Sequence, residues 1–372
     1  MSRWLIYALG GGMGHLTRGL ALARRAARDG ATVQVVSNSR FALRLLNSGV
    51  FSLNPSIAEN LSSSENTPEK SVPIRRQPLI HLEPGIELIA IPPDLGKEAV
   101  SRTVRQVVGE SAQFDVLVVD TFPRGLAGEL TELLPSCSAT KVLVHRYLSP
   151  DYVTWAGLET FIDHYNLVVV PGEDAPLSGV SRARRTAPWF LCDTSELLTP
   201  TAAREALGVS ADVECPGRLG SESPVVVVVG TGKPVESFSA AVAADELSRR
   251  LVGQATVRFA SFDNVALDRA GPLGCSPWPL LATLRGVDLL IGAGGYNTVH
   301  EARATSTRLI ATAQPRLYDR QESRLKPEEL AQSWNHAIDL AVRCIQEMDS
   351  GPRAEIGQLS LGTDAAWRAI MN

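Results

Sequence analysis

Residues 288–302, DLLIGAGGYNTVHEA, decide the fold that the sequence predicts. A short apolar run comes first, a glycine turn follows, and a segment of helical period begins at once. This order predicts a buried strand that leads into a helix. Gly294 and Gly295 let a ligand approach the backbone, and the free N–H groups of the first helical turn favour a negatively charged group. The stretch therefore predicts an α/β domain with a diphosphate site at the end of a strand.

The start of the chain has the same arrangement. An apolar strand at 4–9 runs into residues 10–19, GGGMGHLTRG, and a helix follows. A dinucleotide-binding turn fits poorly, because His15 stands where the third glycine belongs and the next strand ends at Asn38 without an acid for a ribose. A plain strand-to-helix turn is the simpler alternative. However, a histidine at this end of a parallel sheet lies where ligands bind, so His15 is a candidate site residue.

Short apolar runs alternate with helical segments along most of the chain, which predicts parallel sheets covered on both faces. The expected strands are 4–9, 32–37, 86–91, 115–120, 141–145, 167–171, 225–229, 256–260, 288–291 and 308–312. The expected helices include 16–29, 98–111, 124–134, 235–252, 278–285 and 296–305. A proline-rich break at 172–224 separates two sets of strands, so two domains are expected.

Composition excludes several classes of protein. The chain has 372 residues, 44% of them apolar and 20% charged, and a net charge of −4, which argues against a protein that coats nucleic acid. Five cysteines without a C-x-x-C pair indicate a reduced compartment, and no cluster of ligating side chains has metal-site spacing. The apolar run at 4–9 is too short for a signal peptide. We therefore expect a cytoplasmic protein, and contact with the inner face of the membrane stays open.

Two further strand ends carry polar residues. Asp120 ends one strand and is interpreted either as the N-cap of the next helix or as a partner that orients His15. Residues 230–234, GTGKP, do not form a Walker A motif, because Val227 and Pro234 stand at two of its required positions. In a parallel domain this turn would still place Thr231 near bound phosphates.

Three segments together resemble a known family: residues 10–19, 292–302 and 314–324, the last reading QPRLYDRQESR. They are similar to segments of the GT-B glycosyltransferases, above all the group that adds N-acetylglucosamine to the lipid-linked peptidoglycan precursor. The resemblance implies two doubly wound, Rossmann-like α/β domains that face each other across a cleft. It also implies a UDP-sugar donor, no separate cofactor, no metal, and inversion at the anomeric carbon.

The resemblance assigns roles to individual residues. In the family, the position of Glu301 binds the ribose, and the positions of Asp319, Gln321 and Glu322 hold the donor sugar. The implied nucleotide-binding residues are Gly12, Gly14, Thr231, Gly294, Gly295, Tyr296, Asn297, Thr298 and Glu301. Ser306 and Arg308 stand where the family often has glycine and proline, which leaves the donor sugar open.

The resemblance also divides the chain. Residues 1–190 are expected to form the acceptor-side domain and 191–350 the nucleotide-sugar domain, while 351–372 form a C-terminal helix that could pack back on the first domain. Residues 52–82, rich in Ser, Asn, Pro and Glu, are interpreted as a disordered surface loop, and an acceptor-side lid is the alternative. Arg75 and Arg76, beside Leu79 and Ile80, are the candidates for a membrane-contacting patch.

The function expected is transfer of a hexose or N-acetylhexosamine from a UDP-sugar to a hydroxyl acceptor, with His15 as the base and Asp120 as its partner. Two alternatives remain: a sugar-nucleotide epimerase of the same fold, and a nucleotide-sugar-binding relative without catalysis. The acceptor also stays open, since a lipid-linked saccharide, a cell-wall intermediate and a natural-product aglycone all fit the sequence.

Overall fold

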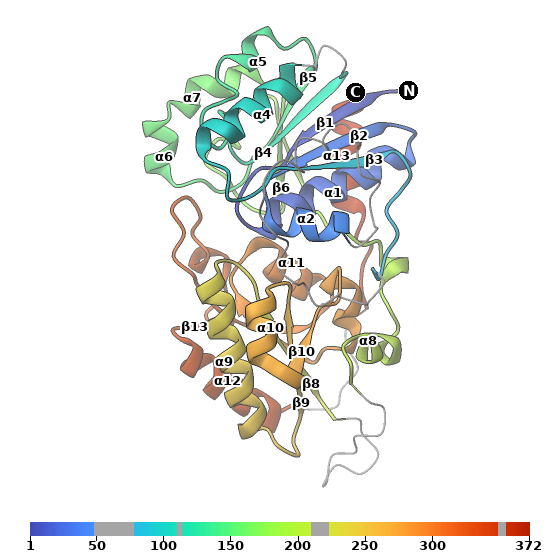
Figure 1. Cartoon of the computed structure of the whole chain (residues 1–372), viewed down its shortest axis with the longest axis vertical. Helices are drawn as coiled ribbons and strands as arrows, with labels where there is room; N and C mark the ends of the chain where they lie inside the picture. Colours follow the sequence, from blue (N-terminus) through green and yellow to red (C-terminus); the bar gives the residue numbers. More distant parts are fainter. Residues whose placement is uncertain (48–77, 110–113, 210–222, 349–354) are drawn as a thin grey trace, which may run out of the picture.

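The structure, a computed structural model, describes residues 1–47, 78–109, 114–209, 223–348 and 355–372. These residues form two lobes, each built around one parallel sheet (Figure 1). Most of the loop expected at 52–82, including Arg75 and Arg76, lies outside the described residues.

The first sheet has seven parallel strands in the order β3-β2-β1-β4-β5-β6-β7. The strands are β1 (Arg3–Tyr7), β2 (Thr32–Ser37), β3 (Ile86–Ala90), β4 (Val116–Asp120), β5 (Thr140–Val144), β6 (Leu167–Pro171) and β7 (Ala183–Thr186). Its helices are α1 (Met13–Arg28), α2 (Arg40–Asn47), α4 (Lys97–Gly109), α5 (Leu133–Ser136), α6 (Pro150–Trp155) and α7 (Leu158–Phe161).

The second sheet has six parallel strands in the order β10-β9-β8-β11-β12-β13. The strands are β8 (Val225–Gly230), β9 (Thr256–Ser261), β10 (Gly274–Cys275), β11 (Leu289–Ala293), β12 (Arg308–Thr312) and β13 (Leu330–Ala331). Its helices are α8 (Pro200–Ala206), α9 (Pro234–Arg250), α10 (Asn264–Ala270), the 3₁₀ helix η5 (Leu280–Gly286), α11 (Tyr296–Ala304) and α12 (Trp334–Gln346).

Both sheets are doubly wound. The chain adds strands on one side of β1 or β8 and then returns to the other side with β4 or β11. Each sheet therefore has a switch point beside its first strand, where such sheets bind ligands. The predicted α/β class and every predicted strand position are confirmed within a few residues, whereas the edge strands β7, β10 and β13 were not predicted.

The helix expected at 124–134 was wrong. Gly125 and Gly128 have φ angles of +84° and +86°, a conformation that breaks a helix. The buried carboxylate of Glu129 accepts hydrogen bonds from the hydroxyl of Tyr7 and from the backbone N–H of Ala127, the latter at 2.7 Å. These bonds stabilise a turn instead, and only Leu133–Ser136 are helical.

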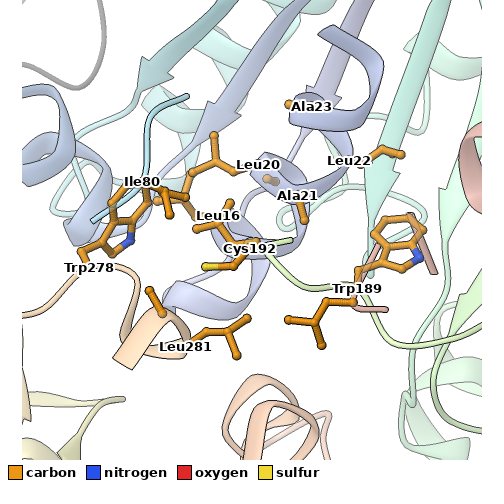
Figure 2. Close-up of a cluster of buried hydrophobic side chains, with 14 of the residues drawn as sticks. Leu16, Leu20, Ala21, Leu22, Ala23, Ile80, Trp189, Cys192, Trp278 and Leu281 are labelled. Carbon is orange, nitrogen blue, oxygen red and sulfur yellow. The ribbon is translucent and has the colours of Figure 1, made fainter. Parts of the chain in front are cut away.

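An apolar cluster joins the two domains. Leu16 and Leu20 of α1 are fully buried and lie beside Trp278 and Leu281, which precede and begin η5 of the second domain (Figure 2). Ile80 completes this side of the cluster. The two domains therefore share a continuous hydrophobic core at α1.

The burial of Ile80 contradicts the membrane-contacting patch that was expected around it. Its side chain is buried, and the backbone N–H of the half-buried Leu79 donates to the carbonyl of Trp278 at 2.8 Å. This segment is thus occupied by contact with the second domain. None of the described helices is long and apolar enough to span a membrane.

The helix α13 (Leu361–Met371) packs on the first domain, against α1 and the edge of the sheet at β7 (Figure 1). Trp367 stacks on Trp4 of β1 with ring centroids 5.0 Å apart, and Asp364 pairs with Arg25 of α1 at 2.6 Å. The C-terminal segment therefore covers one face of the first sheet.

Replacing Trp367 by alanine should lower the free energy of unfolding by about 3–5 kcal/mol, because it removes a large buried ring and leaves a cavity against Trp4. Urea unfolding followed by circular dichroism measures this change. Trp155→Ala is the matched control: that ring is 82% exposed, and its loss should cost less than about 0.5 kcal/mol. Equal losses in both variants would contradict the packing of α13.

Candidate functional site

The site begins at the switch point of the first sheet. β1 and β4 are neighbours there, and the chain beyond them carries His15 and Asp120. The N–H of Gly10 donates to Oδ1 of Asn38 at 2.8 Å and fixes the turn after β1. A Cβ atom on Gly10 would lie 2.2 Å from Cδ2 of His15, so glycine is required for the imidazole to fold back against this turn.

His15 and Asp120 are in direct contact. Nδ1 of His15 lies 2.6 Å from Oδ2 of Asp120, and the imidazole, 17% exposed, stacks on Phe122 at 5.6 Å. Burial lowers the pKa of His15, although the charge of Asp120 opposes this change. The imidazole is therefore mostly neutral near pH 7, with Nε2 as its remaining basic nitrogen.

Arg18 holds the other side of Asp120. Its Nη2 donates to Oδ2 at 2.7 Å and its Nε to Oδ1 at 3.2 Å. Burial opposes ionisation of Asp120, but the charges of Arg18 and His15 outweigh it and hold the pKa of Asp120 well below its usual range. The sequence analysis did not single out Arg18. Its position three residues after His15, on the same helical face, is the signal that could have found it.

The backbone is strained at the same place. Thr121, directly after Asp120, has a φ angle of +71°, which is rare for a β-branched residue. Its N–H donates to the carbonyl of Val144 at 2.9 Å, and its Oγ1 lies 3.4 Å from Nη2 of Arg18. Such strain persists where surrounding contacts enforce it, typically at functional sites.

The second domain contributes the turn after β11. Gly294 is buried, and a Cβ atom there would lie 3.3 Å from Cβ of Gln321 and 3.0 Å from Leu325, so this loop requires a small residue. Gly295 is the N-cap of α11, and the ring of Tyr296 follows it. The free N–H groups at this helix start point to the same region as the start of α1.

A cavity of about 530 Å³ lies between the two domains. Most of the predicted site residues line it: Gly12, Gly14, His15, Thr231, Gly295, Tyr296, Asn297, Thr298, Asp319 and Gln321. Asp120 lies behind His15, and Gly294 packs under Gln321. Glu301 and Glu322 do not belong to the lining.

Basic side chains outnumber acidic ones in the lining, although its four arginines also pair with carboxylates behind it. Five basic side chains contribute to it: Arg18, Arg40, Arg146, Lys233 and Arg316. Asp319 is the single carboxylate among the described residues that line it. Within the described part of the chain, Nη1 of Arg18 and Nε of Arg146 are buried without a hydrogen-bond partner. The cavity is therefore suited to an anionic ligand.

The predicted donor-sugar residues differ in their surroundings. Oδ1 of Asp319 pairs with Arg324 at 2.8 Å, and Arg324 also pairs with Glu173 of the first domain at 2.7 Å. Gln321 is buried, and its Oε1 accepts from the N–H of Gln314 at 3.0 Å. Glu322 is exposed. The loop is thus held rigidly against the first domain, with Asp319 and Gln321 at the cavity.

Glu301 lies on α11, outside the cavity lining and near Cys192 in the region where the domains meet. Its carboxylate makes no hydrogen bond within the described residues, and burial raises its pKa to about 8. Such a carboxyl group lacks the donors that an ionised carboxylate needs.

His145 does not belong to the site. It is fully buried, its Nε2 accepts from the N–H of Leu177 at 3.2 Å, and burial lowers its pKa to about 4. His145 therefore belongs to the buried edge of the core, and its neighbour Arg146 lines the cavity instead.

No protein-family model matches the chain, and no curated protein matches it. Solved structures do. A Listeria monocytogenes protein assigned as a UDP-N-acetylglucosamine 2-epimerase has a TM-score of 0.52 and 11% identity, over 98% of this chain and 94% of that one. A Streptomyces sp. SF2575 glycosyltransferase complexed with thymidine diphosphate has a TM-score of 0.49 and 13% identity, over 100% of this chain and 96% of that one. MurG of Acinetobacter baumannii has a TM-score of 0.45 and 10% identity, over 100% of this chain and 99% of that one.

Identities this low show the fold alone. The chain is similar in fold to the Listeria structure over 98% of its length, and its two doubly wound sheets flank one cavity. The predicted fold of two doubly wound, Rossmann-like α/β domains that face each other across a cleft is therefore confirmed.

Glu301→Gln should stabilise the protein at high pH. Between about pH 4.3 and 8 the unfolded carboxyl ionises while the folded one keeps its proton, so stability falls as the pH rises through this window. Glutamine removes this loss. The melting temperature of the variant should exceed that of the wild type by several degrees at about pH 9 and match it at about pH 4.5.

Differential scanning fluorimetry at both pH values measures this difference. The exposed Glu328→Gln is the control and should show no such trend. A variant difference that is the same at both pH values would refute the raised pKa of Glu301.

Proposed function

We propose that the protein is a glycosyltransferase that moves a hexose or N-acetylhexosamine from a UDP-sugar to a hydroxyl acceptor, with inversion. One observation carries this proposal: the contact of 2.6 Å between His15 and Asp120, on the wall of a cationic cavity that the starts of two helices face. A polarised imidazole beside a diphosphate site supplies what this reaction needs, a base and a stabilised leaving group.

The donor would bind mainly to the second domain. Its diphosphate would lie at the start of α11, near Gly294 and Gly295, with the turn of Gly12 and Gly14 facing it from the first domain. Thr231 and the side chains of Asn297 and Thr298 would add polar contacts. No cofactor beyond the UDP-sugar is required. The same chemistry would accept a thymidine diphosphate sugar, because these contacts address the diphosphate and not the base.

The ribose would reach Glu301 beyond the cavity lining. Its hydroxyls would provide the donors that this carboxylate lacks, so binding would favour the ionised form of Glu301. The sugar would meet Asp319 and Gln321, with Glu322 at the margin of the same loop. Since Arg324 already holds Asp319, this carboxylate would keep a fixed orientation for a sugar hydroxyl.

The chemical step would run through His15. Nε2 would take the proton of the acceptor hydroxyl while its oxygen forms the new bond to the anomeric carbon. The bond from this carbon to the diphosphate oxygen would break with its electron pair, and the basic lining would hold the charge of the leaving UDP. Asp120 would stabilise the imidazolium formed, as a carboxylate behind a catalytic histidine does.

An epimerase of the same fold is the competing function. It would need acidic groups in the cavity, and Asp319 is the single carboxylate among the described lining residues. Incubating the protein with UDP-N-acetylglucosamine, without an acceptor, separates the two functions. Appearance of an epimeric sugar by NMR would favour the epimerase.

UDP should bind less tightly to Glu301→Ala, by at least about tenfold, because a charged hydrogen bond typically contributes 1.5–3 kcal/mol. Calorimetric titration with UDP measures the change, and circular dichroism verifies folding. Glu328→Ala is the control and should bind as the wild type does. An unchanged Kd for Glu301→Ala would remove the ribose assignment.

His15→Ala should lower kcat by about 10²–10⁴-fold with little change in UDP affinity, because the base acts only in the chemical step. Asp120→Asn should show a smaller loss of the same kind. A screen of hydroxyl acceptors, with UDP release as the signal, provides the assay. The exposed His164→Ala is the control. Near-normal kcat for His15→Ala would place the base elsewhere, and loss of UDP binding would make His15 a phosphate ligand.

A further inference from the structure

We propose that Arg18 is a positioning residue for the base: it fixes Asp120 against His15, offsets the charge of Asp120, and ties this pair to Tyr296 at the nucleotide loop. The inference rests on the proposed function in one respect, the role of His15 as base. The contacts that carry it belong to the protein without any ligand.

The first contact set fixes the carboxylate. Arg18 engages both oxygens of Asp120, Oδ1 through Nε and Oδ2 through Nη2, while His15 lies at Oδ2. A planar guanidinium fork leaves the carboxylate little freedom to rotate. Because the side chain of Arg18 is only 1% exposed, water does not compete for these bonds. Asp120 can therefore present Oδ2 to His15 in one orientation.

The second contact reaches the other domain. The guanidinium carbon of Arg18 lies 5.3 Å from the ring centroid of Tyr296, and Arg146 lies 4.4 Å from the same centroid. The hydroxyl of Tyr296 accepts from the N–H of Trp189 at 3.3 Å, which fixes the ring. Tyr296 is the first residue of α11, directly after Gly295. Arg18 thus spans the distance between β4 of the first sheet and the proposed diphosphate loop of the second.

The charges around His15 also support the positioning role. The charged groups that face His15 are Asp120 from β4, Arg18 from its own helix, and Arg146 from the end of β5. An Asp–His pair on its own favours the imidazolium, which cannot accept a proton. Burial is the largest cause that lowers the pKa of His15, and the charge of Arg18 acts in the same direction. Asp120 can therefore orient the ring while the ring stays neutral. A base held near neutral pH needs both properties.

The rival role for Arg18 is direct binding of phosphate. Its Nη1 has no hydrogen-bond partner within the described residues, and the side chain contributes to the cavity wall. The two roles make different demands on His15. Phosphate binding on its own requires no effect of Arg18 on the titration of His15 in the absence of UDP, whereas the positioning role requires one.

The decisive experiment uses the full chain labelled with ¹³C-histidine, without UDP. The pH titration of His15 is followed by NMR, and its signal is assigned by its loss in His15→Gln. In Arg18→Gln the midpoint of His15 should rise by about one pH unit, because Asp120 is no longer compensated. UDP affinity is measured for the same variant, because Arg18 also belongs to the cavity wall.

Arg25→Gln is the matched control. It removes the same charge from α1, but Arg25 pairs with Asp364 of α13 and stacks on Trp367, away from the site. Its His15 midpoint should equal that of the wild type. A rise of similar size in both variants would reduce the effect to general charge and overturn the proposal.

Arg18→Gln could fail to fold, since it leaves Asp120 buried without its main partner. Arg18→Lys then tests the positioning role, because lysine keeps the positive charge but cannot contact both oxygens of Asp120 as the guanidinium does. The titration midpoint of His15 should stay near that of the wild type. The line width of His15 should increase, since one oxygen of Asp120 is released. A sharp, unshifted His15 signal in Arg18→Lys, or an unshifted midpoint with more than tenfold weaker UDP binding in Arg18→Gln, would overturn the positioning role.

Transfer activity gives an independent readout once a donor and acceptor are known. The acid limb of the kcat profile should move to higher pH in Arg18→Gln. If the protein transfers no sugar, the proposed function fails, yet the NMR titration still decides whether Arg18 controls His15.

Discussion

The burial of α1 between the two domains is the constraint on which the rest of the structure depends. On one side Gly19 lets the helix pack closely on β1, where a Cβ atom would lie 3.1 Å from that of Ala8. On the other side Leu16 and Leu20 pack against Trp278 and Leu281 (Figure 2). Because close-packed cores deform little, the helix that carries His15 and Arg18 is fixed relative to both sheets. The distance between the two glycine turns follows from this packing.

Ion pairs complete the arrangement at the edges of this core. Arg24, buried on α1, pairs with Glu83 at 2.8 Å and with Glu196 of the interdomain connection at 2.6 Å. Glu173 of the first domain pairs with Arg324 of the second. The positive charges of Arg146 and Arg324 outweigh the effect of burial and lower the pKa of Glu173 to about 2. Breaking such buried pairs is costly. The two domains therefore meet through apolar contacts at the centre and charged contacts around them.

Much of the fold could be predicted from the sequence, for physical reasons. Strands buried on both faces, such as β8 with its valine run, are visible as apolar runs. β7 was missed because Arg184 and Arg185 give an edge strand no apolar signal. The segment 124–134 has a helical pattern, yet the two glycine turns and the burial of Glu129 against Tyr7 prevail. That contact is formed with a strand far away in the sequence, which no local pattern reveals.

Some residues of the functional site could be predicted from the sequence, and others could not. His15 and Asp120 follow from a topological rule, because Asp120 ends β4 and His15 lies in the first turn of the helix that follows the adjacent strand β1. Arg18 and Arg146 do not, since an arginine on a helix or a strand end is usually solvated, and its role depends on partners brought by other elements. The position of Glu301 outside the cavity lining also depends on how the domains meet, which the sequence pattern of α11 does not contain.

The return of α13 to the first domain has a consequence for how the chain folds as it leaves the ribosome. Trp4 is synthesised before the second domain, but its stacking partner Trp367 is synthesised only after it. The part of the first sheet around Trp4 therefore lacks the cover of α13 until the second domain has been synthesised, and α1 covers this face without it. Domains generally fold as units in the order of synthesis, and exposed apolar surface in such intermediates attracts chaperones. In this protein the domain that begins first is the one that is completed last.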